Sequence, residues 1–308
     1  MIINKNKKEF KIMKIYDCFM YFDEEIVVDL RLNTLNEFVD YFVIVESKFT
    51  HKGDPRKLKF NHKKFEKFKD KIIYLVYEEE SEKIEIINKS DNEDEKSRKY
   101  ILNAAYRENG QRDYLQNGLV GAEKDDFILI SDVEEIPKLS KLNFNNIKEK
   151  IILFKQDMFY YKFNLHLPNL IWTGTKGCKK KHLISPQWLR NIKDRKYYFY
   201  RIDTFFSEKK YINIKILNNG GWHFSNIKTA KEIEHKLRSY LHHREFDANP
   251  LSIDEIDSII KNKQAIYDLT VDKTTNKIGN GSKLEKFDFE KLPIHIQKNL
   301  DNYKEWID

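Results

Sequence analysis

The chain has 308 residues, of which 40% are hydrophobic and 14% aromatic, so it can bury the core of one large domain and is not extensively disordered. Lys and Arg outnumber Asp and Glu by 56 to 49, and the net charge of +7 suits nucleic acid, anionic lipid or a phosphorylated small molecule. Basic and acidic residues are mixed along the whole chain, however, which is typical of a solvated surface.

The first half of the sequence alternates apolar strands with helices. Val28, Leu32, Leu35 and Val39 recur at helical spacing, whereas YFVIVES is the continuous β-branched run of a strand buried on both faces. The predicted strands are 14–22, 41–47, 71–79 and 125–137, and the predicted helices between them are 23–40, 62–70 and 96–118. This alternation predicts an α/β fold with a Rossmann-like, mostly parallel sheet and helices on both faces.

The pattern changes after Pro137, where strand-like segments follow one another without long helices between them. We expect a mixed or antiparallel extension of the sheet in this half. The expected strands are 151–165 and the segments around 182–188 and 196–202, the expected helices are 229–246 and 253–266, and the stretch 270–288 has a loop-like composition.

The domain organisation follows from these elements. We expect a flexible arm at 1–13, one domain at 14–268 and an extension at 269–308 that packs on it. The two cysteines, Cys18 and Cys178, have neither metal-knuckle nor disulfide spacing. The N-terminus has no signal-peptide core, and no run reaches the roughly 20 apolar residues of a membrane span. We therefore expect a cytoplasmic protein, with peripheral attachment to a membrane left open.

The strongest candidate for a functional site is FILISDVEEIP, residues 127–137. In open α/β sheets, ligands bind outside the carboxyl ends of the strands. Asp132 and Glu134 are two residues apart in an extended segment and are expected to project to the same side, with Glu135 pointing elsewhere. Two adjacent carboxylates repel unless a cation lies between them, and Mn²⁺ or Mg²⁺ with phosphate oxygens fits that need.

The sequence also resembles glycosyltransferase family 17, which includes the β-1,4-mannosyl-glycoprotein β-1,4-N-acetylglucosaminyltransferase. SDVEEIP is similar to the D-x-D-E-I-P element of that family, and further segments agree in order: YFVIVES with FTHKGDPRKLKF, YRENGQRDYL, FYYKFNL with WTGTK, and GGWHFS followed by a helix ending near HHREF. The resemblance spans residues 14–247. Glu134 stands where the family has Asp, which can alter the metal or donor preference.

The resemblance implies a GT-A-like fold and an inverting, metal-dependent transfer of N-acetylglucosamine from UDP-N-acetylglucosamine to a glycan hydroxyl. Animal members of the family are Golgi membrane proteins. Because this chain shows no anchor, we expect a bacterial or viral enzyme, in the latter case in the host cytoplasm, rather than a Golgi protein.

Three charged residues are candidates for donor binding alongside Asp132. Arg107 and Arg112 lie on a predicted helix and carry guanidinium groups suited to a diphosphate, although an ion pair of Arg112 with Glu108 or Asp113 is an equally good interpretation. Glu46 ends the second strand at the same edge of the sheet, where GT-A enzymes hold the nucleotide.

Aromatic and polar residues after the acidic strand supply the other candidates. Trp222 in GGWHFS offers a flat face for donor stacking, and His223 is a candidate third metal ligand, although a hydrogen-bonded structural histidine is as good an interpretation. Trp172 and Thr175 in IWTGTK are candidates for the acceptor side, with a core position as the alternative for the tryptophan.

The catalytic base is left open among three carboxylates. Inverting transfer needs a base that takes the proton of the acceptor hydroxyl. Glu135, Asp157 and Asp203 are the candidates, none supported by a spacing argument, and orienting Asp132 is an equally good role for Glu135.

Two other classes of function use the same carboxylates. One is a metal-dependent phosphotransferase or nuclease, against which stand the lack of a glycine-rich phosphate loop and the mixed surface charge. The other is a carbohydrate-binding relative without catalysis. We expect a UDP-sugar and a glycan as partners and no nucleic acid. The sequence does not predict the oligomeric state.

Overall fold

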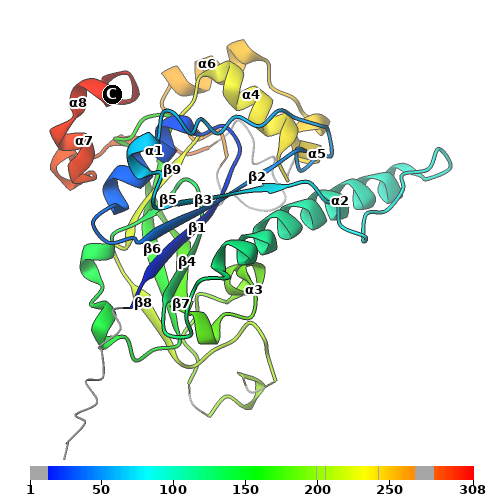
Figure 1. The fold of residues 1–308 in the computed structure, drawn as a ribbon. Coiled ribbons are helices and arrows are strands. Elements are labelled where there is room, and N and C mark those ends of the chain that lie inside the picture. Colours follow the sequence, from blue (N-terminus) through cyan, green and yellow to red (C-terminus); the bar gives the residue numbers. More distant parts are fainter. Residues whose placement is uncertain (1–12, 199, 205, 242, 268–280) are drawn as a thin grey trace, which may run out of the picture.

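The structure, a computed structural model, describes residues 13–198, 200–204, 206–241, 243–267 and 281–308 (Figure 1). The described residues form one mixed ten-stranded sheet in the order β3-β2-β1-β4-β7-β6-β9-β5, with β10 paired to β7 and β8 paired to β6. The predicted α/β class is therefore confirmed.

The first half of the chain contains the predicted parallel strands. β3, β2, β1 and β4 are neighbours in that order and all run in the same direction. The elements are β1 (Ile15–Tyr21), α1 (Glu25–Leu35), β2 (Tyr41–Ser47), β3 (Ile72–Tyr77), α2 (Glu93–Tyr114) and β4 (Phe127–Asp132). The predicted helix at 62–70 is only a 3₁₀ turn at Glu66–Phe68.

The apolar run of each central strand divides between two layers because successive side chains point to opposite faces. Phe127 and Leu129 of β4 belong to a core that includes α1, whereas Ile128 and Ile130 belong to a second core. That second core contains side chains of α3 (Pro186–Asn191) and of the 3₁₀ turn after α2. Helices therefore cover both faces of the sheet, as predicted.

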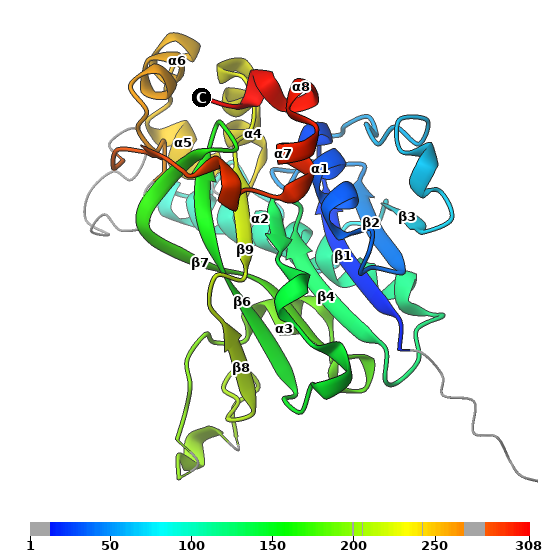
Figure 2. The ribbon, with the colours of Figure 1, turned by 90° about the vertical axis from the view of Figure 1, so that its left-hand side faces the viewer.

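The second half extends the sheet with antiparallel strands, as expected (Figure 2). β7 pairs antiparallel with both β4 and β6. The remaining elements are β5 (Glu135–Pro137), β6 (Ile151–Tyr160), β7 (Leu165–Lys179), β8 (Ile214–Leu217), β9 (Gly221–Ser225), α4 (Ala230–Ser239), α5 (His243–Ala248), α6 (Ile253–Lys261), β10 (Glu285–Lys286), α7 (Ile294–Lys298) and α8 (Leu300–Tyr303).

Two sequence-based assignments in this half are wrong. Residues 182–188 do not form a strand, because the Ser185 hydroxyl accepts from the Trp188 amide at 3.1 Å and Pro186 occupies the first turn, which starts α3. The described part of 196–202 lies in the connection between α3 and β8 and contributes no strand. Its apolar side chains are not buried, so a strand there would gain no packing partner.

The described part of the C-terminal segment packs on α1. Leu292, Ile296 and Tyr303 share a core with the buried side chains of α1, and the Tyr303 hydroxyl donates to Asp29. Residues 1–12 and 268–280 of the predicted arm and tail lie outside the described residues, and the domain boundaries stay predictions. None of the helices within the described ranges is long and apolar enough to cross a membrane.

Candidate active site

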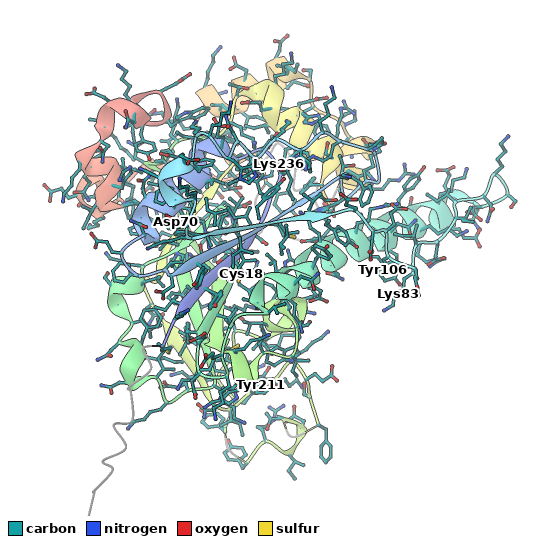
Figure 3. The ribbon with its side chains drawn as sticks, viewed as in Figure 1. Cys18, Asp70, Lys83, Tyr106, Tyr211 and Lys236 are labelled. Carbon is teal, nitrogen blue, oxygen red and sulfur yellow. The ribbon has the colours of Figure 1, made fainter. Side chains whose placement is uncertain are left out.

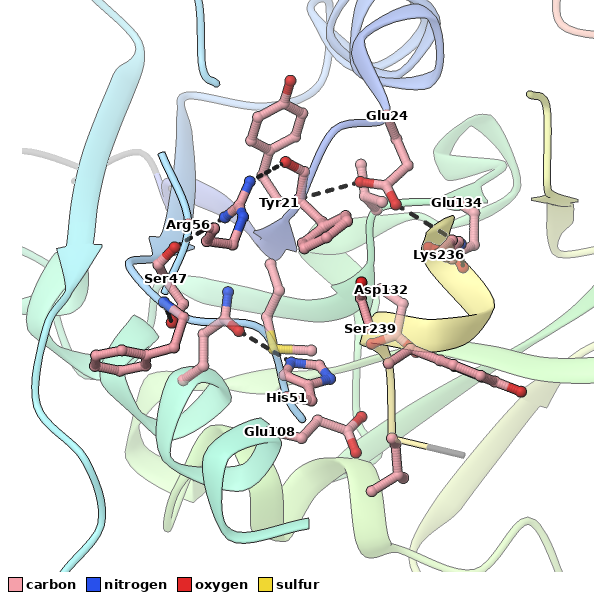
Figure 4. Close-up of a pocket in the computed structure, with 17 residues that line it drawn as sticks. Tyr21, Glu24, Ser47, His51, Arg56, Glu108, Asp132, Glu134, Lys236 and Ser239 are labelled. Carbon is pink, nitrogen blue, oxygen red and sulfur yellow. Dashed lines mark hydrogen bonds and ion pairs between the residues drawn. The ribbon is translucent and has the colours of Figure 1, made fainter. Parts of the chain in front are cut away.

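A cavity of about 230 Å³ lies at the carboxyl ends of β1, β2 and β4 (Figure 4). Four parts of the chain line it besides the end of β4: the segment after β1, the segment after β2, α2 and the end of α4. Parallel strands place their carboxyl ends at one edge of a sheet, which is why segments distant in sequence meet here. The cavity is where the sequence analysis expected a ligand.

The acidic segment forms a turn rather than the end of one strand. β4 ends at Asp132, Val133 and Glu134 make the turn, and Glu135 begins β5, which pairs with β9 instead of continuing beside β1. The prediction of a single strand over 125–137 is therefore wrong. Asp132 and Glu134 nevertheless both line the cavity.

A buried arginine that the sequence analysis missed fixes the backbone of this turn. Arg31 of α1 is fully buried and binds Asp17 of β1 through two hydrogen bonds of 2.6 and 2.7 Å. Its Nη1 donates to the carbonyls of Val133 and Glu135 at 3.1 and 2.7 Å. The carbonyl oxygens of the turn are thus held by hydrogen bonds from Arg31. Because the backbone is held there, the directions in which its side chains project are set as well.

Two further arginines bind the Asp132 carboxylate. Arg112 of α2 donates to Oδ1 at 3.0 Å, and Arg190 of α3 donates to Oδ2 at 2.8 Å. Arg112 also donates to Glu108 at 2.7 Å, which confirms the ion pair considered from the sequence. Burial alone would raise the pKa of Asp132, but Arg190 and Arg112 outweigh it and lower that pKa, so Asp132 is ionised at neutral pH.

Glu135 is completely buried, and both of its carboxylate oxygens have partners. Oε1 accepts from Trp172 Nε1 at 2.7 Å and from Arg190 at 2.9 Å, while Oε2 accepts from Arg190 at 2.7 Å and from the Asp132 amide at 3.0 Å. Its carbonyl accepts from the Thr175 hydroxyl at 3.0 Å. Glu135, Trp172 and Thr175 therefore hold Arg190 and the turn in place.

His223 of β9 lies beside this cluster, and one of its ring nitrogens lacks a hydrogen-bond partner among the described residues. Its Nδ1 is buried and makes no hydrogen bond within the described residues, and it lies 4.0 Å from Glu135 Oε1. Burial lowers the pKa of His223, although Glu134, Glu135 and Asp132 act in the opposite direction. A neutral imidazole beside carboxylates suits a divalent metal when its free nitrogen is the unprotonated one.

The donor set Asp132, Glu134 and His223 fits Mn²⁺ or Mg²⁺ by its chemistry but is not closed around an ion. Among the described residues, no group of three or more His, Cys, Asp or Glu has the arrangement of a metal site. Asp132 is held by its two arginines, and Glu134 lies 3.5 Å from Lys236 Nζ. Side-chain movement would have to accompany metal binding.

A second charged group lies next to Glu134 on the cavity wall. Glu24 accepts from the amides of Phe22 and Asp23 at 3.1 and 3.0 Å, and it lies 3.7 Å from Lys236. Burial would raise the pKa of Glu24, but Lys228, Lys236 and the two amides lower it to about 2. Lys236 therefore stands between two acids, Glu24 and Glu134, as Figure 4 shows.

His51 and Gln111 form the polar part of the wall below that group. His51 Nε2 lies 3.1 Å from Gln111 Oε1, and Gln111 Nε2 donates to the Val45 carbonyl at 3.3 Å. Glu108 lies one helical turn before Gln111 and also lines the cavity. Glu108, Gln111 and Arg112 are spaced three and four apart, so their shared helix face could have been read from the sequence.

Two predicted donor-binding residues do not line the cavity but hold residues that do. Glu46 is fully buried and accepts from Tyr74 at 2.8 Å and from Arg56, a lining residue, at 2.8 Å. Arg107 donates to Glu80 at 2.6 Å and to the carbonyls of the segment after β2. These side chains position neighbours of the cavity.

The structure does not bring the remaining candidates to the cavity wall. Trp222 is buried in the core beside α1, and its Nε1 donates to the Lys291 carbonyl at 3.1 Å. Asp157 lies on β6, where burial raises its pKa and His166 and Lys138 act in the opposite direction. Asp203 pairs with Arg201 and Lys210 in the connection before β8. None of the three lines the cavity.

An α/β fold with a cavity at the carboxyl edge of its parallel strands has the arrangement in which open α/β proteins bind their ligands. The model of glycosyltransferase family 17 matches residues 3–307, so the chain belongs to that family and is a glycosyltransferase. This confirms the resemblance found in the sequence. A glycosyltransferase acts on a sugar donor and an acceptor.

The other two comparisons add little. No curated protein matches the chain significantly. A crystal structure of a mycobacterial protein is similar at 11% identity, covering 89% of this chain and 84% of that one, with a TM-score of 0.32. A similarity of this size carries no information on function.

Proposed function

We propose that the cavity binds a sugar nucleotide, with UDP-N-acetylglucosamine the donor that the family suggests, and that the enzyme transfers the sugar to a glycan hydroxyl with inversion. The observation that carries the proposal is that Asp132 and Glu134 both line one cavity at the carboxyl edge of the parallel strands. The GT-A type of fold is part of the same proposal and is supported by the parallel order β3-β2-β1-β4.

The proposal includes a divalent cation held by Asp132, Glu134 and His223. Supporting it are the two carboxylates on the cavity wall and the unpartnered, buried Nδ1 of His223. A bound Mn²⁺ or Mg²⁺ would supply positive charge to the diphosphate of the donor. Arg112 and Arg190 are positively charged like the proposed cation and lie beside Asp132. A guanidinium group binds phosphate as readily as carboxylate.

The reaction itself needs a base in the cavity. The acceptor oxygen forms a bond to the anomeric carbon, the bond from that carbon to the diphosphate breaks, and the hydroxyl proton passes to a carboxylate. Glu108 lines the cavity and joins the list of candidate bases, ahead of Asp157 and Asp203, which do not. Glu24 lines it too, but its pKa of about 2 and the two amides that it accepts from make it a weaker base. Because every oxygen of Glu135 is occupied by a hydrogen bond, we assign it the orienting role.

Calorimetry with a panel of nucleotide sugars tests the proposal. UDP-N-acetylglucosamine and other donors are titrated with Mn²⁺, with Mg²⁺ and with a chelator, using wild type, Asp132→Asn and Glu134→Gln. We expect metal-dependent binding of one UDP-sugar that both variants weaken at least tenfold. Glu285→Gln, which removes an exposed charge of β10 outside the cavity, is the control.

Three outcomes would contradict parts of the proposal. Absence of binding to every nucleotide sugar removes the donor assignment. Equal binding with metal and with chelator removes the cation. Donor binding without hydrolysis or transfer in the presence of metal favours the carbohydrate-binding alternative.

A further inference from the structure

The connection between α3 and β8, residues 192–213, extends from the end of the molecule opposite the cavity (Figures 1 and 2). Figure 3 shows the separation, with Tyr211 at the lower end and Lys236 at the upper end. Its described part contains only a 3₁₀ turn, at Ile202–Thr204. Connections longer than roughly 12–15 residues with so little regular structure are uncommon in compact domains and are often functional. The cavity and its proposed chemistry give this segment no role.

Large apolar side chains in the described part of the connection are exposed to an unusual degree. The exposed fraction is 69% for Tyr198, 63% for Tyr200, 71% for Ile202 and 86% for Phe206. The rings of Tyr198 and Tyr200 are stacked at a centroid distance of 5.3 Å. Scattered exposed apolar residues need no explanation, but a group of them within one projecting segment indicates a contact surface.

The same segment is basic. Residues 192–213 contain six Lys or Arg and three Asp or Glu, and Lys193, Arg195, Lys196 and Lys209 are exposed. At the base of the connection the Lys150 amide donates to Asn213 Oδ1 at 3.3 Å.

We propose that residues 192–213 dock the enzyme onto an anionic lipid bilayer. Tyr198, Ile202 and Phe206 would enter the boundary between headgroups and acyl chains, where tyrosine and other amphipathic rings are favoured. The basic residues beside them attract anionic headgroups, and each contributes to the binding free energy when it lies close to the membrane surface. The cavity then lies at the end of the protein away from the lipid surface.

Two other partners fit these observations less well. A single nucleic acid strand would stack on the aromatic rings, but the exposed aliphatic Ile202 offers it no π face. A second copy of the chain would bring the same basic segment against itself, because twofold interfaces are formed by the same patch on both subunits. A bilayer satisfies both the apolar and the basic residues.

Vesicle sedimentation with the full-length chain tests the proposal. Vesicles of phosphatidylcholine alone are compared with vesicles that also contain phosphatidylglycerol, at low and high salt. We expect binding to the anionic vesicles that falls with salt, since screening shortens the reach of surface charge to about 8 Å at 0.15 M. The variant Tyr198→Ser/Ile202→Ser/Phe206→Ser is expected to lower the partition coefficient about tenfold or more.

The matched control is Ile86→Ser/Ile294→Ser, which removes two side chains that are 79% and 65% exposed on other parts of the surface. It should bind vesicles as wild type does. Circular dichroism and donor titration on all variants separate this question from folding and from the cavity. Equal binding to neutral vesicles, or unchanged binding by the triple variant, overturns the proposal. So does binding to RNA, or self-association through this segment, without vesicle binding.

Discussion

Arg190 joins Asp132 to Glu135: its guanidinium donates to Asp132 Oδ2 at 2.8 Å and to the two Glu135 oxygens at 2.7 and 2.9 Å. The Arg190 side chain is 11% exposed, and that of Glu135 is fully buried. Burial would lower the pKa of Arg190, but the two carboxylates raise it. The Arg190 guanidinium thereby links Asp132, on the cavity wall, to Glu135, which solvent does not reach.

Arg190→Ala should lower the free energy of unfolding by about 3–5 kcal/mol, because it leaves the buried Glu135 carboxylate without its cation. Arg190→Lys should recover part of that loss, since an ammonium group cannot donate to three oxygens in the same fork. Urea unfolding measures both. Arg98→Ala is the control, because Arg98 makes a similar fork onto the exposed Glu85. A loss for Arg190→Ala no greater than for the control contradicts the structural role.

Gly174→Ala should disturb the cluster beneath the turn. A Cβ at Gly174 would lie 1.7 Å from Gln156 Oε1 and 3.0 Å from Glu135 Cδ, so the buried Gln156 would have to move. Its Oε1 would then lose the hydrogen bond from the Thr175 amide, now 3.1 Å. We expect a destabilisation of about 1–3 kcal/mol, measured as a shift in the urea midpoint, together with weaker donor binding.

Gly121→Ala is the matched control for that substitution. A Cβ at Gly121 meets nothing within 4 Å, so stability should change little. If both alanine variants behave alike, the packing beneath the acidic turn is looser than the structure indicates.

Arg107→Ala should act on the cavity through the segment after β2. Arg107 Nη1 donates to the carbonyls of His51 and Lys52 at 3.3 and 3.1 Å, and its guanidinium lies against Gly53. Without it, His51 loses its fixed position on the cavity wall. We expect a several-fold rise in the donor dissociation constant by calorimetry, with less than about 2 kcal/mol lost in stability.

The outcome for Arg107 distinguishes direct from indirect action. Arg107→Lys keeps a charge but not the fork, so a direct diphosphate contact would survive in part whereas the carbonyl contacts would not. Equal effects of Ala and Lys favour the indirect role. Lys96→Ala, which removes an exposed ion pair on the same helix, should leave binding unchanged.

Two histidines with buried ring nitrogens should make the protein sensitive to acid. Burial lowers the pKa of His166 and of His243, and the Nε2 atom of each has no hydrogen-bond partner among the described residues. Below the ordinary value of about 6.5 the unfolded chain takes up protons that the folded chain refuses. Their contribution to stability is therefore present above pH 6.5 and is lost as the pH falls towards the lowered folded values.

Urea unfolding at pH 7.5, 6.5 and 5.5 measures that dependence. His166→Asn/His243→Gln should show a shallower loss of stability between pH 7.5 and 5.5 than wild type, whatever its absolute stability. The slope is the readout, because the substitutions themselves alter packing. An unchanged slope would mean that other groups cause the acid sensitivity.

The alternation of apolar runs and amphipathic segments was sufficient to predict the parallel strands. β2 matches its predicted bounds, and β1, β3 and β4 lie within the ranges predicted for them. For β1, β2 and β4 the reason is that a strand buried on both faces needs a continuous apolar run. The acidic segment and its place at the carboxyl edge followed from the same pattern. The family resemblance rested on short motifs in the right order.

The partners of each polar side chain depended on the tertiary structure. Arg31 is 101 residues from Asp132, and Arg190 is 58 residues from it, so no local spacing marks either as part of the site. Trp222 looked like a stacking surface but fills the core, because the sheet pairing of β9 turns its ring towards α1. Whether an exposed-looking group is a ligand or a structural support depends on which elements the folded chain brings beside it.

The sequence by itself determined the class of fold, the position of the acidic segment and the family, since these depend on periodicity and on residues close together in the chain. Only the tertiary structure decided that Glu135 is a buried anchor, that Glu24 and Glu108 face the cavity, and that residues 192–213 project at the far end. The physical reason is that burial and ion pairing are set by contacts between elements far apart in sequence, which a local pattern does not encode.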